Sequence, residues 1–127
     1  MPKLARDLTP EEIARYRATA LERERGKARR AEQRHRRAWD LARRAAQLLR
    51  TKYRAARVVA FGSLVEEGRF GLGSDVDIAV WGLPGAAYFR AVAEVAEMDP
   101  EIPIDLVDGE SCSGGLLHSI EKNGVEL

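Results

Sequence analysis

The chain has 127 residues and a formal net charge of +1 at pH 7, a length that predicts one domain with one modest core. Its single cysteine, Cys112, excludes an intramolecular disulfide and a zinc site built from several cysteines. No apolar run approaches the roughly 20 residues of a membrane-spanning helix and no apolar signal core is visible, so we expect a cytoplasmic protein without a membrane segment.

The small net charge hides two regions of opposite charge. Residues 27–57 hold twelve Lys or Arg but only Glu32 and Asp40 as acids, a net charge of +10, whereas the rest holds nine basic and eighteen acidic residues, a net charge of −9. Such a basic stretch is either a solvated helix face or a surface for RNA or an acidic partner. Its low aromatic content argues against stacking on nucleic-acid bases.

The first half of the chain predicts helix. Thr9 and Pro10, followed by two glutamates, are typical of a helix start, with a capping hydroxyl, a proline at the first position and acids in the first turn. Gly26 is expected to break or weaken this helix. A second, long helix is expected over about 27–53.

One face of that long helix carries mostly small residues. They are spaced alternately three and four positions apart: Ala28, Ala31, His35, Ala38, Ala42, Ala45 and Leu49. Small residues let another element approach closely, and the sequence leaves open whether this is the rest of the chain or a second copy in a homodimer. We interpret residues 1–54 as a basic helical extension packed on a core of residues 55–127, together one compact domain.

The second half alternates strands and helices around glycine-containing turns. The expected elements in chain order are a strand at 57–61, a loop at 64–74 with a short helical turn at its start, a strand at 76–81, a helix at 86–98, a strand at 102–107 and a helix at about 113–122. The expected fold class is therefore α/β, with helices on a small mixed sheet and a long N-terminal helical extension.

Three aspartates in or directly before these strands call for a chemical explanation. Asp75 and Asp77 are two positions apart, so they project from one face of a strand, where two anions repel each other. Asp105 lies in the apolar strand 102–107. If the two strands are neighbours, three carboxylates converge and could hold Mg²⁺ or Mn²⁺, with two ions at roughly 3.5–4 Å. Taken alone, the first pair is equally compatible with turn residues, and Asp105 with an exposed edge position.

Gly62-Ser63 directly follows the first strand. A glycine lets the backbone approach a ligand and adopt positive φ. The Ser63 hydroxyl and nearby backbone N–H groups could hold terminal phosphates, especially if a helical turn begins there. Ser63 is a phosphate contact rather than a nucleophile, because neither His35 nor His118 stands at a useful spacing for a general base.

Together these motifs resemble the polymerase beta-like nucleotidyltransferase superfamily in its minimal, stand-alone form. The resemblance rests on VVAFGS, SDVDIAVWG, PIDLVD and the tail LLHSIEKNGVEL, and covers about residues 55–127. A lone Asp-x-Asp would be weak, but with an upstream Gly-Ser and a downstream strand aspartate it is specific. Ser63 and Asp75 are one residue further apart than the commonest family spacing.

The resemblance implies an enzyme that moves a nucleoside monophosphate, AMP in the first instance, from ATP or another triphosphate to a macromolecule. Gly62 and Ser63 match the triphosphate grip, Asp75 and Asp77 the metal-binding pair, and Asp105 the third carboxylate, which shares a metal and helps activate the acceptor. The implied partner is a HEPN-type ribonuclease toxin, with this chain as antitoxin, or a tRNA. The alternative is an inactive fold that neutralises a partner by binding it.

Overall fold

The computed structural model describes residues 7–127. The elements in chain order are α1 (Pro10–Thr51), β1 (Arg57–Phe61), the 3-10 helix η2 (Gly62–Leu64), β2 (Val76–Trp81), α2 (Gly85–Ala96), β3 (Ile104–Asp108), α3 (Gly114–Asn123) and β4 (Val125–Glu126). The α/β fold class is confirmed, with one mixed four-stranded sheet in the order β3-β2-β1-β4. No helix among these residues is long and apolar enough to cross a membrane.

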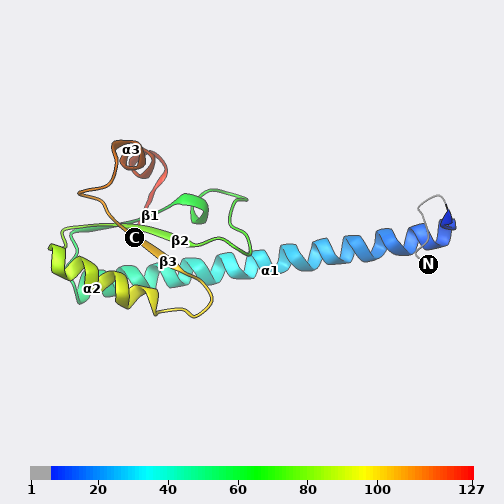
Figure 1. The fold of residues 1–127 in the computed structure, drawn as a ribbon, viewed down its shortest axis with the longest axis horizontal. Coiled ribbons are helices and arrows are strands. Elements are labelled where there is room, and N and C mark those ends of the chain that lie inside the picture. Colours follow the sequence, from blue (N-terminus) through cyan, green and yellow to red (C-terminus); the bar gives the residue numbers. More distant parts are fainter. Residues whose placement is uncertain (1–6) are drawn as a thin grey trace.

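The two faces of the sheet are covered unequally. Figure 1 shows α1 and α2 on one side of the sheet and α3 on the other. The α1 and α2 side forms the main core, in which alternate strand residues such as Val58, Ile78 and Leu106 pack against the helices. The α3 side has a smaller cluster around Val59 and Ile120. Asp77 and Asp105, which alternate in the same sense as Ala79 and Val107 along their strands, lie on this second face outside the apolar cluster.

The N-terminal half forms one helix rather than the two expected. α1 runs through Gly26 without interruption for 42 residues. It begins as predicted, since the Thr9 hydroxyl accepts a hydrogen bond from the Glu12 backbone N–H at 3.1 Å. A single glycine costs about 1 kcal/mol in a helix, which the surrounding helix-forming residues offset. Of the two effects expected at Gly26, a break or a weakening, the break does not occur, so the expected division into two helices was wrong.

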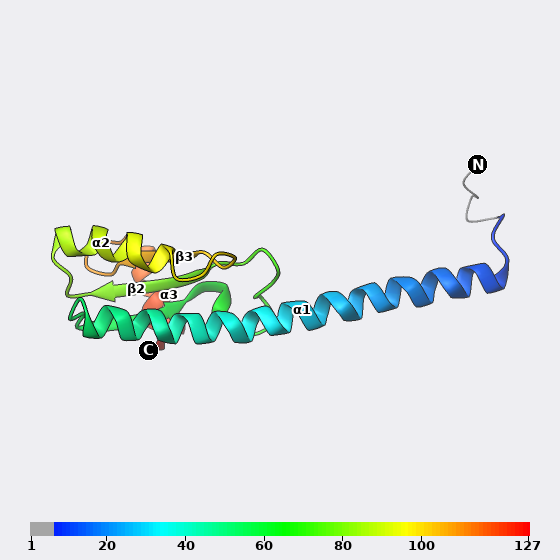
Figure 2. The ribbon, with the colours of Figure 1, turned by 90° about the horizontal axis from the view of Figure 1, so that it is seen from below.

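Only part of α1 packs on the sheet. Its buried residues are Ala38, Leu41, Ala42, Ala45, Ala46 and Leu49, so this part of the predicted seam is an intramolecular contact. Towards the N-terminus the helix leaves the core and projects as an arm (Figures 1 and 2). The division of the chain at residues 54 and 55 stays a prediction.

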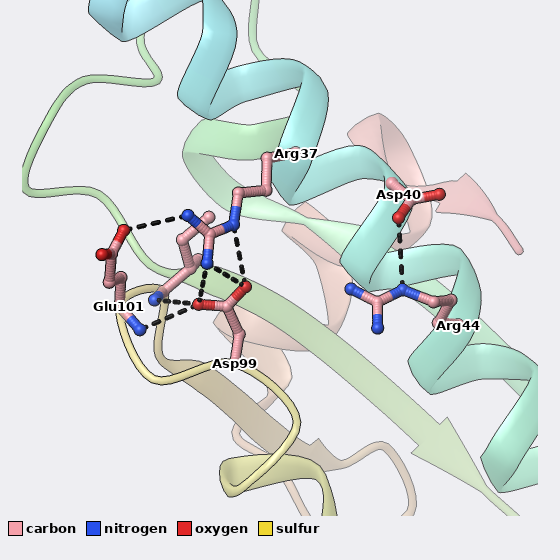
Figure 3. A network of polar contacts seen from close by, with 6 residues as sticks. Arg37, Asp40, Arg44, Asp99 and Glu101 are labelled. Carbon is pink, nitrogen blue, oxygen red and sulfur yellow. Dashed lines mark hydrogen bonds and ion pairs between the residues drawn. The ribbon is translucent and has the colours of Figure 1, made fainter.

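The third strand begins later than expected, at Ile104 instead of residue 102. The reason is the loop before it, where the carboxylate of Asp99 accepts hydrogen bonds from the backbone N–H groups of Glu101 and Ile102, at 2.8 and 3.0 Å. Arg37 of α1 grips the same carboxylate through its Nε and one terminal nitrogen, both at 3.0 Å (Figure 3). This loop is thereby tied to α1 and to the start of β3.

The buried Asp99 carboxylate stays ionised because of these contacts. Burial alone would raise its pKa, but the backbone hydrogen bonds and the Arg37 guanidinium outweigh burial and hold the pKa below its ordinary value. Stability from this group is therefore present at neutral pH and is lost as the pH falls through the lowered pKa.

We predict that Asp99→Asn lowers the free energy of unfolding by about 1–3 kcal/mol at pH 7, because the charge-assisted contact to Arg37 is lost. Urea unfolding followed by circular dichroism measures the difference, and it should shrink as the pH falls below the ordinary aspartate value of 3.8. Glu101→Gln is the matched control: its carboxylate also pairs with Arg37 but is exposed, so we expect less than about 1 kcal/mol. Equal losses in both variants would contradict a special role for Asp99.

Candidate active site

Parallel pairing of β2 and β3 brings two of the predicted acids together. In the strand register Asp77 lies directly beside Asp105, and both side chains project from the sheet face that α3 covers only in part. Asp75 immediately precedes β2, two residues before Asp77. Asp75 and Asp105 are exposed, whereas Asp77 is half-buried. The condition set by the sequence, that the two strands be neighbours, is met.

The Gly-Ser motif lies beside the same carboxylates. β1 pairs with β2 in antiparallel fashion, with Phe61 opposite Asp77, so Gly62 follows at the sheet end where Asp77 lies. Gly62 has a φ of +74°, and a Cβ atom there would lie 2.4 Å from Oδ2 of Asp77. Only glycine fits this position without displacing the carboxylate. The helical turn expected at the start of the loop 64–74 occurs two residues earlier, as η2, which starts at Gly62 and includes Ser63.

Asp77 is the electrostatic centre of the cluster. Burial first, and then repulsion from Asp105 and Asp75, raise its pKa from 3.8 to about 6. The protein therefore holds an anion at a position where an anion is unfavourable, close to two others. A bound cation would remove this cost, and a strongly shifted pKa marks a candidate functional site.

The three carboxylates are neighbours without being arranged as ready-made ligands. Within residues 7–127, no three side chains of His, Cys, Asp or Glu stand close enough together to hold a metal ion. Two of the three carboxylates, those of Asp75 and Asp105, are exposed, and Asp77 is half-buried. The donor set still fits Mg²⁺, which prefers carboxylate oxygens and completes its shell with water and substrate phosphates.

Contacts from α1 to the loop between Ser63 and Asp75 were not expected from the sequence. The Nε2 atom of His35 lies 2.9 Å from the carbonyl oxygen of Leu64, and a terminal nitrogen of Arg34 donates to the carbonyl oxygen of Ser74 at 2.8 Å. The sequence placed His35 on the α1 seam and Arg34 among the basic residues. Nothing in the spacing indicated which loop they would meet.

A separate cavity of about 680 Å³ lies between the C-terminal end of α1 and α2. It is lined by residues from Lys52 to Arg54 and from Pro84 to Glu97. None of the five predicted site residues lines it, so the candidate chemistry is on the open sheet face instead.

Comparison with known families agrees with this geometry. The profile described as "Polymerase beta, Nucleotidyltransferase" matches residues 44–127, which include all five predicted residues. The chain belongs to the polymerase beta nucleotidyltransferase family and is a nucleotidyltransferase of its minimal kind. No curated protein matches the sequence.

Solved structures with the same fold come from toxin–antitoxin complexes. A chain of a toxin–antitoxin complex with AMP-PNP is 27% identical, with a TM-score of 0.56 over 67% of this chain and 70% of that one. A chain of the complex between tri-AMPylated Shewanella oneidensis HEPN toxin and MNT antitoxin is 25% identical, with a TM-score of 0.52 over 70% of each chain. A chain of an MntA–HpeT toxin–antitoxin variant, 24% identical with a TM-score of 0.54 over 67% of this chain and 70% of that one, shows the fold alone.

We predict that Gly62→Ala destabilises the protein more than Gly68→Ala. Both glycines have positive φ, +74° and +76°, so both substitutions cost about 1–2 kcal/mol in backbone strain. A Cβ at residue 62 also meets the Asp77 carboxylate, whereas a Cβ at residue 68 meets nothing within 4 Å. Thermal unfolding of the metal-free proteins measures the difference. Equal melting temperatures for the two variants would show that Gly62 is not pressed against Asp77.

We predict that Asp77→Asn stabilises the metal-free protein at pH 7–8. The folded-state pKa of Asp77 is about 6, above the ordinary 3.8, so its ionised form is penalised on folding and asparagine removes that penalty. The advantage of the variant should decline as the pH falls from 6 and vanish below 3.8, where the wild-type carboxyl is protonated in both states. Melting temperatures between pH 3.5 and 8 test this.

Glu110→Gln is the control for this series, because Glu110 is an exposed acid beyond the far end of β3. It should show no such pH-dependent gain. A wild-type protein more stable than Asp77→Asn at pH 8 without metal would contradict the repulsion at the cluster.

Proposed function

We propose that this chain transfers AMP from ATP to a partner protein, as the antitoxin of a HEPN/MNT-type toxin–antitoxin pair. The observation that carries the proposal is the side-by-side placement of Asp77 and Asp105, with Asp75 and Gly62 around them. The family and the toxin–antitoxin relatives, one with AMP-PNP and one with an AMPylated toxin, support the nucleotide and the kind of acceptor.

In this proposal Asp75, Asp77 and Asp105 hold Mg²⁺, with Mn²⁺ as a substitute. The metal supplies neutralisation of the charge that develops on the phosphate oxygens. Before binding, the three carboxylates repel each other, so the raised pKa of Asp77 is the counterpart of an affinity for cations. The exposure of Asp75 and Asp105 leaves them free to turn towards a shared ligand.

Gly62 and Ser63 grip the β- and γ-phosphates. The positive φ of Gly62 lets the following N–H groups face the triphosphate, and the Ser63 hydroxyl donates a further hydrogen bond. Asp105 would accept the proton of the acceptor hydroxyl. The acceptor oxygen attacks the α-phosphorus in line, the bond from that phosphorus to the bridging oxygen breaks, and pyrophosphate leaves.

The open position of the cluster fits a macromolecular acceptor. The acids lie on the sheet face of the α3 cluster but outside that cluster, so a protein side chain can reach them without a closing lid. A free metabolite would be poorly shielded from water there.

We predict label transfer from [α-³²P]ATP to the protein encoded beside this one, in the presence of Mg²⁺. Asp77→Asn should reduce the rate by at least about 100-fold, because a charge that stabilises the transition state through the metal is lost. Glu110→Gln should retain full activity. The labelled product is identified by gel electrophoresis and intact-mass spectrometry, and the other three nucleotides are tested in parallel.

Two outcomes would redirect the proposal. If wild type and Asp77→Asn bind the partner equally tightly and neither transfers nucleotide, the enzymatic role is refuted. The protein would then be an inactive module that neutralises its partner by contact. Label on tRNA, with none on the partner protein, would replace the protein acceptor by RNA. Size-exclusion chromatography of the pair and transfer assays with total tRNA measure both.

A further inference from the structure

We propose that Arg34 and His35 of α1 are positioning residues that fix both ends of the loop between Ser63 and Asp75. The inference rests on the proposed function, because this loop carries the triphosphate grip at one end and the metal pair at the other. Both residues lie outside the matched family region of residues 44–127. The N-terminal helix would therefore be a working part of the active site as well as an extension.

The first end of the loop is held by His35. Its Nε2 atom is 2.9 Å from the carbonyl oxygen of Leu64, the residue after Ser63. A carbonyl oxygen only accepts, so Nε2 carries the proton in this contact. The bond joins α1 to the end of η2, whose first two residues are Gly62 and Ser63. This contact therefore fixes the orientation of Gly62 and Ser63 relative to α1.

The second end of the loop is held by Arg34. Its terminal nitrogen donates to the carbonyl oxygen of Ser74 at 2.8 Å, and Ser74 directly precedes Asp75. Ser74 also closes a local turn, since its hydroxyl accepts from the Gly71 N–H at 2.9 Å and its own N–H donates to the Gly71 carbonyl at 3.2 Å. The peptide that precedes Asp75 is thus fixed both by the contact with α1 and by the local turn between Gly71 and Ser74.

The middle of the loop is held by Phe70, which is buried. Its ring stacks on that of His35, with centroids 5.2 Å apart and planes 21° apart. The Arg34 guanidinium lies 5.9 Å from the centre of the same ring. Two consecutive α1 residues therefore contact the loop at three points, namely Leu64, Phe70 and Ser74. A loop with three glycines would otherwise sample many conformations.

Arg34 is a poor choice for stability alone. Within the described structure its Nε atom is buried without a hydrogen-bond partner, and a buried donor without a partner is unfavourable. An apolar side chain of similar length would fill this space without that cost. What it would lose is the hydrogen bond to Ser74, which points to positioning as the role of the guanidinium.

The two contacts predict separable kinetic effects. His35→Phe keeps a ring against Phe70 but removes the donor to Leu64, next to the phosphate grip. We expect its KM for ATP to rise about five- to tenfold, the effect of one lost hydrogen bond, with little change in the Mg²⁺ requirement. His35→Gln retains a donor and should recover most of the wild-type KM.

Arg34→Met keeps an apolar stem over Phe70 but removes the donor to Ser74, next to Asp75. We expect the half-saturating Mg²⁺ concentration to rise about five- to tenfold, with a smaller change in the KM for ATP. Arg34→Lys keeps a donor and should recover part of the Mg²⁺ response. Arg36→Gln is the matched control, because Arg36 is an exposed arginine on the same helix that pairs with the exposed Glu32.

Hydrogen–deuterium exchange of the metal-free proteins provides a readout that needs no activity. Amides of residues 64–74 should exchange faster in His35→Phe and Arg34→Met than in wild type or Arg36→Gln, while those of β2 stay protected. If loop exchange is faster in the two variants but the wild-type protein transfers no nucleotide, the proposed function is refuted while the contacts of Arg34 and His35 with the loop stand. Calorimetric Mg²⁺ binding then tests Arg34 directly.

The positioning role is overturned by either of two results. In the first, loop exchange is unchanged in both variants. In the second, melting temperatures fall but KM and the Mg²⁺ requirement match wild type in the folded fraction, so that the contacts are structural only. The opposite pattern, a KM effect at His35 and a Mg²⁺ effect at Arg34 with rescue by Gln and Lys, supports the assignment.

Discussion

The parallel pairing of β2 with β3 is the constraint on which the rest of the site depends. It places Asp77 beside Asp105 on one sheet face, and burial and repulsion raise the pKa of Asp77 as a result. Like charges do not hold two strands together, so the register must be imposed from elsewhere. The opposite face supplies it, because Ile78 and Leu106 are locked into the core under α1 and α2. The burial of apolar side chains on one face of the sheet therefore maintains the unfavourable placement of the two carboxylates on the other face.

α1 organises the three segments that carry the site. Through His35 it holds the turn after β1, through Arg34 the residue before Asp75, and through Arg37 the loop that leads into β3. These three residues lie on little more than one turn of the helix, just N-terminal to the buried stretch that begins at Ala38. The helix then leaves the core as the projecting arm (Figure 2). The buried residues from Ala38 to Leu49 pack α1 on the sheet. The turn of α1 that precedes them, with Arg34, His35 and Arg37, contacts the three segments that carry the site.

The sequence predicted the structure correctly where a feature depends on residues that are close together in the chain. Thr9 and Pro10 marked the start of α1 because capping is a contact within four residues. The strands at 57–61 and 76–81 were found at their observed bounds, since their apolar side chains pack on both faces. The sequence predicted the start of the third strand two residues too early, because the Asp99 carboxylate accepts a hydrogen bond from the Ile102 backbone N–H. The predicted division into two helices at Gly26 was wrong because helix propensity is only a weak local preference.

By itself the sequence determined most of the secondary structure, the α/β class and the identity of the five candidate residues, because periodicity and short motifs are properties of neighbours in the chain. Only the tertiary structure decided that Asp77 and Asp105 are neighbours and that Gly62 is pressed against Asp77. It also decided that Arg34 and His35 meet a loop about 30–40 residues further along the chain. Such contacts depend on how faces of distant elements pack, and no spacing along the chain encodes that packing directly.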